Sequence, residues 1–113
     1  MANMRRLRTR RPTPAAVFAA LGDHTRLALV GRLAAGETAS ITDLTRHSRL
    51  TRQAITKHLR VLERAGIVRC VRAGRESRFE LDPRPLSEIE EYIQRLSREW
   101  DAALERLKAF VEE

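Results

Sequence analysis

Polar and basic side chains recur at helical spacing along one side of the segment 51–65. The other side carries Ile55, Leu59 and Leu62, an apolar stripe that predicts burial of that side against a protein core. Arg and Lys can donate to guanine O6 and N7, Gln can pair with adenine, and Thr can contact phosphate or a thymine methyl group. The residues expected to contact base edges are Arg52, Gln53, Thr56 and Lys57.

Other side chains near this segment suit the DNA backbone. Arg60 on the same helix and Arg49 in the preceding turn are expected to bind phosphate, which positions a protein without selecting a sequence. His58 either donates to a phosphate or braces the fold. An isolated basic helix face would be explained more simply as a solvated surface. Here a short helix and a turn precede the segment and a hairpin follows it, which favours DNA binding.

Four helices are predicted before the hairpin. Each begins at a residue that favours helix N-termini: Thr13, Asp23, Ser40 and Thr51. Asp43 follows Ser40 at the spacing of a capping box, and residues 37–39 are expected to form an extended link. Glycines end the first, second and fourth helices: Gly22, Gly36 and Gly66. The second helix is expected to bury Leu27, Val30, Leu33 and Ala34.

Two strands, 67–73 and 77–81, are predicted to form a hairpin joined at 74–76. Three arginines lie at or beside its tip, where they would contact the DNA backbone or a narrow minor groove; the other reading is a solvated turn. These wing residues are Arg72, Arg75 and Arg78. Cys70 shares a strand face with Val68 and is expected to be a small, partly buried side chain, although a role in redox sensing stays open.

A long last helix is predicted from Pro85 or Leu86 to Val111. Its apolar residues recur at alternating steps of three and four, which indicates a seam for a second copy of the chain; packing within one chain is the alternative. The expected interface consists of Leu86, Ile89, Ile93, Leu96, Trp100, Ala103, Leu107 and Phe110. Three residues of the first helix are candidates to join it: Val17, Phe18 and Leu21.

Charge divides the chain into two parts. Of the 113 residues, 1–80 hold 17 basic and 6 acidic side chains, a net +11, whereas 81–113 hold 5 basic and 9 acidic, a net −4. A basic body with an acidic tail indicates that the body meets a polyanion, although a high-GC genome also enriches arginine. We expect a flexible basic arm at 1–12, a winged helix-turn-helix at 13–84 and a dimerisation helix of the same domain at 85–113.

Several classes of protein are not expected. The chain shows neither an apolar run long enough to span a membrane nor a secretory signal, so a cytoplasmic location is expected. It lacks an arrangement for nucleophilic catalysis and a glycine-rich phosphate loop. The residues that could bind a metal lie on separate predicted elements: His24, His47, His58 and Cys70. We therefore expect no enzyme activity, metal or cofactor.

Three stretches resemble the ArsR-type (ArsR/SmtB-like) winged helix-turn-helix repressors. They are Phe18-Ala-Ala-Leu-Gly-Asp-His-Thr-Arg-Leu27, the segment from Leu50 through Thr-Lys-His-Leu to Ala-Gly-Ile-Val68, and Gly74-Arg-Glu. The resemblance covers about residues 14–110. It implies a mainly helical fold with a small β-hairpin, in the order α-α-α-α-β-β-α, that dimerises through its first and last helices.

The resemblance also implies repression of transcription by a homodimer that binds an inverted repeat in double-stranded DNA. His58 and Arg26 match residues that are usual at these positions. The segment 40–47 lacks cysteine and residues 85–113 lack histidine, which departs from the metal-sensing members and indicates a non-metal-sensing subgroup. Gating by Cys70 oxidation or by an unknown small-molecule inducer, and non-specific binding of nucleic acid, stay open as alternatives.

Overall fold

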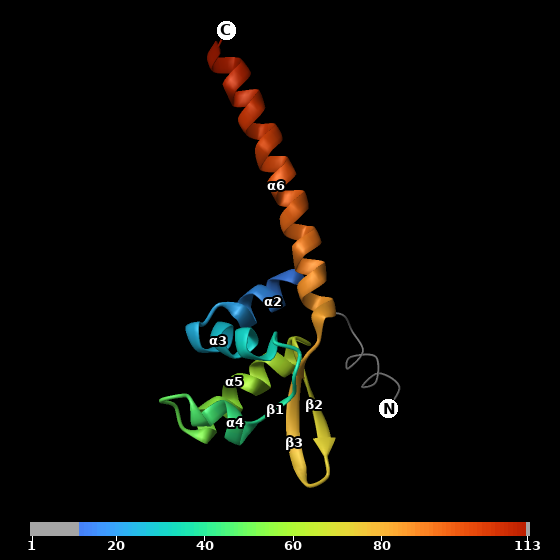
Figure 1. Ribbon diagram of the computed structural model, residues 1–113. Coiled ribbons are helices and arrows are strands. Elements are labelled where there is room, and N and C mark those ends of the chain that lie inside the picture. Colours follow the sequence, from blue (N-terminus) through green and yellow to red (C-terminus); the bar gives the residue numbers. More distant parts are fainter. Residues whose placement is uncertain (1–11, 113) are drawn as a thin grey trace.

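The computed structural model describes residues 12–112, in which a small antiparallel sheet extends from one side of a helical body (Figure 1). The helices are α2 (Pro14–Leu21), α3 (His24–Leu33), α4 (Ile41–Arg46), α5 (Arg52–Arg64) and α6 (Pro83–Glu112). The strands are β1 (Ala39–Ser40), β2 (Val68–Ala73) and β3 (Glu76–Leu81). The predicted basic arm lies outside the described residues, apart from Pro12. None of the helices in 12–112 is both long and apolar enough to cross a membrane.

The predicted caps begin the four helices that precede the hairpin. Their side-chain oxygens accept backbone N–H groups of the first turn over 3.0–3.1 Å, in Thr13, Asp23, Ser40 and Thr51. Asp43 completes the capping box, because its carboxylate accepts the Ser40 N–H at 3.1 Å. Gly66 follows α5 with φ +77°, a left-handed conformation that ends a helix at little cost only for glycine.

The sheet of the described residues has the strand order β1-β3-β2, one strand more than the sequence predicted. The link expected at 37–39 ends in β1, where Ala39 pairs with Phe79 and Ser40 with Arg78. The hairpin is confirmed, but its turn consists of Gly74 and Arg75 alone, because Ala73 pairs directly with Glu76. Gly74 has φ +67°, which suits the first central position of a type II′ turn.

The apolar stripe of α5 lies at the centre of the core, as predicted. Ile55, Leu59 and Leu62 are at most 1% exposed, and they belong to one buried cluster that includes side chains from α3, α4 and β3. The prediction for α3 was partly wrong: Leu27 is 53% exposed and Ala34 is exposed, whereas Leu29 is buried. Leu29 and Leu33, one helical turn apart, belong to the buried core, and α3 contacts α5 and β3. Helix α3 therefore turns a different side toward the core than the sequence predicted.

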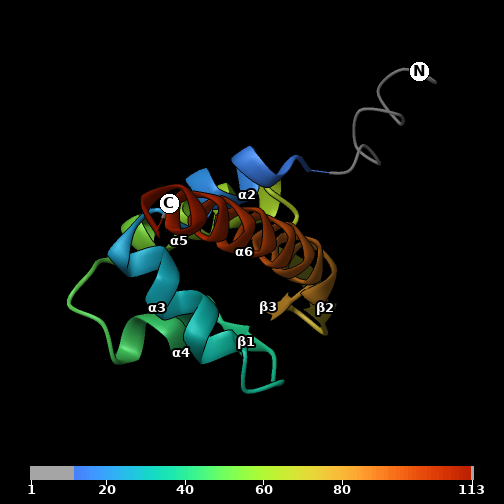
Figure 2. The same cartoon turned by 90° about the horizontal axis from the view of Figure 1, so that it is seen from above.

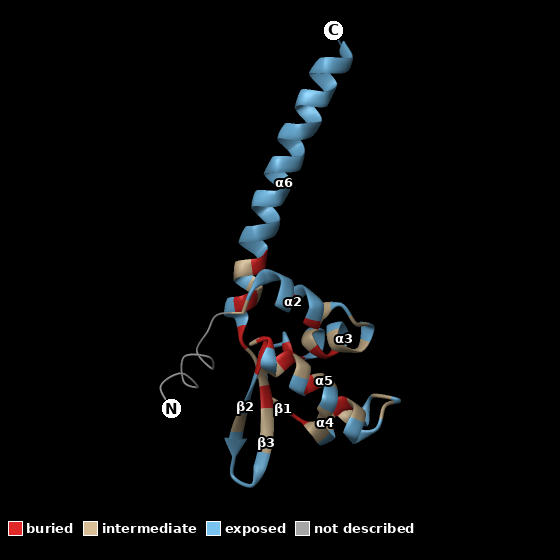
Figure 3. Cartoon of the chain, turned by 180° about the vertical axis from the view of Figure 1, so that it is seen from behind, coloured by how far each residue is buried: buried red, intermediate tan, exposed pale blue. Residues whose placement is uncertain are grey.

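Helix α6 begins at Pro83, two or three residues before the predicted start. Proline is tolerated there because the first N–H groups of a helix have no partner within it. Pro85 and Ile89 are buried against the body, whereas every described residue from Glu90 onward is exposed. The rest of this 30-residue helix, about 45 Å long in all, projects away from the body (Figures 1 and 3).

Asp82 holds the start of α6, and its removal is expected to weaken the fold in a pH-dependent way. Its buried carboxylate accepts the Arg84 N–H at 3.1 Å and pairs with the Arg84 guanidinium at 2.6 Å. The Arg84 side chain is the main cause that lowers the pKa of Asp82 to about 2. Asp82→Ala should reduce the free energy of unfolding at pH 7 by about 1 kcal/mol, measured by urea denaturation followed by circular dichroism.

The sign of the pH effect follows from the lowered pKa. The carboxylate stabilises the fold fully above the ordinary Asp pKa of 3.8, and this contribution is lost as the pH falls through about 2. The difference between Asp82→Ala and the unchanged protein should therefore be smaller at pH 3 than at pH 7. Asp82→Asn, which keeps an acceptor but no charge, is the matched control. An equal difference at both pH values would contradict this account.

Candidate nucleic-acid interface

Helix α5 presents a continuous polar face on the side opposite its buried stripe. The side chains of this face share one groove along the helix surface: Arg52, Gln53, Thr56, Lys57, Arg60, Val61 and Arg64. All four predicted base-contacting residues are among them. Of these four, Arg52, Gln53 and Lys57 are exposed and Thr56 is half-buried. Four of the seven side chains are cationic and none is acidic, so the face is complementary to a polyanion.

Contacts within the protein orient part of this face. Arg52 donates to the Thr42 hydroxyl of α4 at 2.6 Å, which joins the two helices of the helix-turn-helix unit. The Thr56 hydroxyl donates to the Arg52 carbonyl at 2.7 Å, so its methyl group is the part left for an outside partner. Arg60 pairs with Glu63 at 2.8 Å, an exposed ion pair of the kind that contributes little to stability and can exchange for phosphate.

Gln53, Lys57 and Arg64 make no side-chain hydrogen bond or ion pair within residues 12–112, so they are available to a ligand. Arg64 was not among the sequence candidates. Its spacing of four residues from Arg60 places it on the same face, and that spacing was the signal that could have identified it. Thr42 was also missed, because its role arises from the packing of α4 against α5.

The wing arginines fall into two groups. Arg72 and Arg75 are exposed, and within the described residues their side chains have no hydrogen-bonding partner. Arg78 instead donates to the Thr38 hydroxyl at 2.7 Å, to the Thr38 carbonyl at 2.9 Å and to Asp43 at 3.2 Å. Its guanidinium therefore ties the wing to α4 and to Thr38, the residue before β1.

The acidic partner of Arg78 is held ionised. The Ser40 backbone N–H, followed by the Ser40 hydroxyl, lowers the pKa of Asp43, and the positive charge of Arg78 adds to this effect. The same carboxylate thus caps α4 and anchors the wing. Because α4, α5 and the wing are connected in this way, the helix face and the hairpin tip keep a defined mutual orientation at the end of the molecule away from the tip of α6 (Figure 1).

His58 lies on the side of α5 that faces α3. Its Nδ1 is 3.2 Å from the Arg26 guanidinium and 3.8 Å from the Asp23 carboxylate. A guanidinium can only donate, so Nδ1 accepts this hydrogen bond. Arg26 also donates to the carbonyls of Ala19 and Ala20 at the end of α2. These contacts support the bracing role of His58 and lead its side chain away from the polar face.

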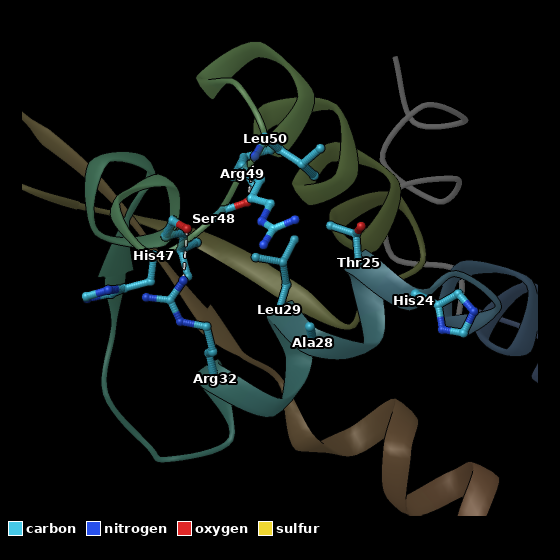
Figure 4. A pocket seen from close by; sticks show the side chains of 11 residues that line it. His24, Thr25, Ala28, Leu29, Arg32, His47, Ser48, Arg49 and Leu50 are labelled. Carbon is cyan, nitrogen blue, oxygen red and sulfur yellow. Dashed lines mark hydrogen bonds between the residues drawn. The ribbon is translucent and has the colours of Figure 1, made fainter.

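Arg49 lies apart from the other candidates. Its side chain lines a cavity between α3, α4 and α5, where the close-up view shows its guanidinium above Leu29 (Figure 4). His24 and His47, which the sequence placed at the surface, are exposed. Within residues 12–112, no three His, Cys, Asp or Glu side chains gather in a way that could hold a metal ion.

Cys70 is exposed, so the expectation of partial burial was wrong. Its partner across the hairpin, Phe79 of the central strand β3, is 1% exposed. Cys70 itself lies on β2, an edge strand of the sheet, and the core covers Phe79 but not Cys70. Nothing else in the described residues singles out this thiol as a sensor.

The residues expected at the interface between copies separate into two groups. Val17 and Ile89 are 1% and 6% exposed and belong to the core of the single chain, and Leu21 and Leu86 pack against that core. The other residues are exposed: Phe18 lies on α2, and the rest form a row along α6 that ends with Leu107 and Phe110. Phe18 of α2 meets Tyr92 of α6 edge to face, with ring centroids 6.1 Å apart, where α6 crosses α2 (Figure 2).

Comparisons with known proteins agree with this geometry. Residues 11–71, more than half of the chain, match the model of a helix-turn-helix domain family. The HTH-type transcriptional regulator Rv2034 of Mycobacterium tuberculosis is 36% identical over 92 residues, which cover 81% of this chain and 82% of that protein.

Solved structures of similar proteins extend the comparison to nearly the whole chain. An ArsR-like transcriptional regulator from Rhodococcus sp. RHA1 superimposes with a TM-score of 0.76 at 32% identity, over 97% of this chain and 96% of that one. The homodimeric winged helix-turn-helix domain of Mb0332 from Mycobacterium bovis shares the fold at 20% identity, with a TM-score of 0.60 over 75% of this chain and 78% of that one. The chain therefore belongs to the ArsR family of winged helix-turn-helix transcriptional regulators.

Proposed function

We propose that this regulator is a repressor that binds an inverted-repeat operator in double-stranded DNA as a homodimer. The observation that carries the proposal is the amphipathic division of α5, whose apolar stripe is fully buried while its opposite face exposes four cations and Gln53 beside the half-buried Thr56. A helix that is anchored on one side and polar on the other can enter the major groove, which is about 12 Å wide.

Each part of the surface has its own role in this proposal. Gln53 and Lys57, near the N-terminus of α5, contact base edges together with Arg52 and Thr56, whereas Arg60 and Arg64 further along bind phosphate. Arg72 and Arg75 of the wing reach the neighbouring backbone or minor groove, where a narrow groove attracts arginine. Arg78 and His58 take no part in DNA contact, because their side chains are engaged within the protein.

A second copy would cover the exposed apolar row of α6. Trp100 is 63% exposed, Leu107 59% and Phe110 76%, an unusual degree of exposure for large apolar side chains that recur along one helix. A two-fold mate buries such a row with its own copy, and the structural neighbour Mb0332 is itself a homodimer. Pairing along α6 would place two α5 helices about one DNA turn, roughly 34 Å, apart.

Substitutions on α5 should separate base contacts from phosphate contacts. Gln53→Ala is expected to weaken binding to the operator, recovered by selection from random DNA, by about 1–3 kcal/mol and to change binding to random DNA little. Arg64→Ala should weaken both and reduce the slope of log K against log salt by about 0.9, because one phosphate contact is lost. Fluorescence anisotropy titrations at several salt concentrations measure both quantities.

The matched control is Arg98→Ala, which removes the same charge from the outer side of α6 and should leave both affinities unchanged. Equal losses on operator and random DNA for Gln53→Ala would show that Gln53 does not contact a base. A ratio of operator to random affinity below about ten for the unchanged protein would favour non-specific nucleic-acid binding instead.

Trp100→Asp should convert the dimer to monomers, because each subunit would bury a carboxylate in the apolar seam without a partner. The body of the monomer is expected to stay folded, since Trp100 lies outside the buried core. Operator affinity should fall by about 10²–10⁴-fold as the two half-sites are no longer bound together. Sedimentation velocity and circular dichroism check the mass and the fold. Arg98→Asp is the control, and an unchanged sedimentation coefficient for Trp100→Asp would refute the seam.

A further inference from the structure

A cavity of about 380 Å³ lies behind the helix-turn-helix unit, between α3, the turn at 47–50 and the start of α5 (Figure 4). This volume is within the range of small-molecule sites, about 300–1,000 Å³. Its walls come from His24, Thr25, Ala28, Leu29, Arg32, Leu44, His47, Ser48, Arg49, Leu50 and Ile55. Neither α2 nor α6 contributes to it, so a dimer formed along α6 leaves the cavity accessible.

The inner wall of the cavity is apolar. The exposed Ala28 and the half-buried Leu50 form its accessible apolar surface, and Leu29, Leu44 and Ile55, which are at most 3% exposed, form the floor beneath them. Aliphatic side chains of this kind bind hydrocarbon or aromatic groups by removing them from water. The cavity therefore suits a ligand with an apolar portion of a few carbon atoms rather than a fully polar one.

The polar part of the lining is basic. Two arginines and two histidines line the cavity, and no carboxylate does. Arg32 donates to the carbonyls of Leu44 and Asp43 at 2.9 and 3.0 Å, so its guanidinium is held at the end of α4. Arg49 is exposed and makes no hydrogen bond or ion pair within residues 12–112. Its guanidinium lies beside Leu50, Leu29 and Thr25 in the close-up view (Figure 4). A guanidinium in this position can bind a carboxylate through two parallel hydrogen bonds.

We propose that this cavity binds a small apolar carboxylate. The hydrocarbon or aromatic portion of the ligand lies on Ala28 and Leu50, and its carboxylate pairs with Arg49. Arg49 belongs to the turn that leads into α5, so a bound anion would neutralise this cation and hold the turn in one conformation. We therefore expect ligand binding to release the protein from its operator. This regulatory consequence rests on the proposed function, whereas the binding of the ligand does not.

Binding is tested without DNA, by ¹H–¹⁵N NMR of the full-length protein titrated with sodium benzoate or hexanoate at constant ionic strength. Saturable shifts are expected at the amides of Thr25, Ala28 and Leu50, with a Kd on the order of 1 mM for ligands of this size. Benzamide, which has the same shape without the charge, should bind at least about tenfold more weakly. Arg49→Gln should lose the response to benzoate, whereas Arg46→Gln, an arginine outside the cavity, should keep it.

Three results would overturn the site: no saturable shift, equal binding of benzamide and benzoate, or shifts confined to the exposed face of α5 and the wing. The regulatory consequence is then measured with operator DNA, where saturating benzoate should lower the affinity about fivefold or more and have no effect on Arg49→Gln. Benzoate binding without any change in operator affinity would overturn the coupling alone. A protein that binds benzoate but no DNA would refute the proposed function and leave the site intact.

Discussion

Burial of the apolar stripe of α5 is the interaction on which the rest of the structure depends. Ile55, Leu59 and Leu62 fix the rotation of this helix about its own axis, because no other side of it can enter the core. The polar face is then exposed by necessity, and the caps at Thr51 and Gly66 set where that face begins and ends. A rotation of α5 by one residue, about 100°, would bury cations and expose leucines at once.

The elements around α5 extend this constraint to the wing and to α4. Arg52 joins α5 to α4 through Thr42, and Arg78 joins the wing to α4 through Thr38 and Asp43. Arg78 is held within the protein by these contacts, whereas Arg52 stays exposed together with Gln53, Lys57, Arg72 and Arg75. Charge is divided along the chain in a way that suits this arrangement. Residues 1–80 are strongly basic, whereas residues 81–113, most of which form the projecting helix α6, are acidic overall.

Local signals predicted most of this fold. The N-caps, the glycines after α2 and α5 and the stripe of α5 depend on residues within one or two turns of each other, and the structure confirms them. Helix α3 instead ends at Leu33, before the predicted stop at Gly36. Features that depend on distant residues were missed. Strand β1 has two residues and exists only because β3 lies beside it. The burial of Leu29 rather than Leu27 depends on where α5 and β3 meet α3. The exposure of Cys70 depends on the position of β2 at the edge of the sheet.

The candidate interface shows the same division. Spacing on α5 identified Gln53 and Lys57, and it also contained Arg64, which the sequence reasoning did not use. The engagement of Arg78 and the position of the exposed Arg49 beside a cavity arise from tertiary partners about which their neighbours in sequence give no information. A prediction from residue type alone therefore counts too many arginines as free to contact DNA, because some of them are engaged by other parts of the folded chain.

Methylation interference on the selected operator tests the central claim most directly, because dimethyl sulfate modifies guanine N7 in the major groove. If α5 enters the major groove in each subunit, modification should block binding in two tracts with centres about one helical turn, 10 base pairs, apart on one side of the duplex. A parallel experiment ethylates the phosphates of the same operator. If ethylation blocks binding but methylation of guanine N7 does not block it at any position, the exposed face of α5 does not contact bases, and the account is contradicted.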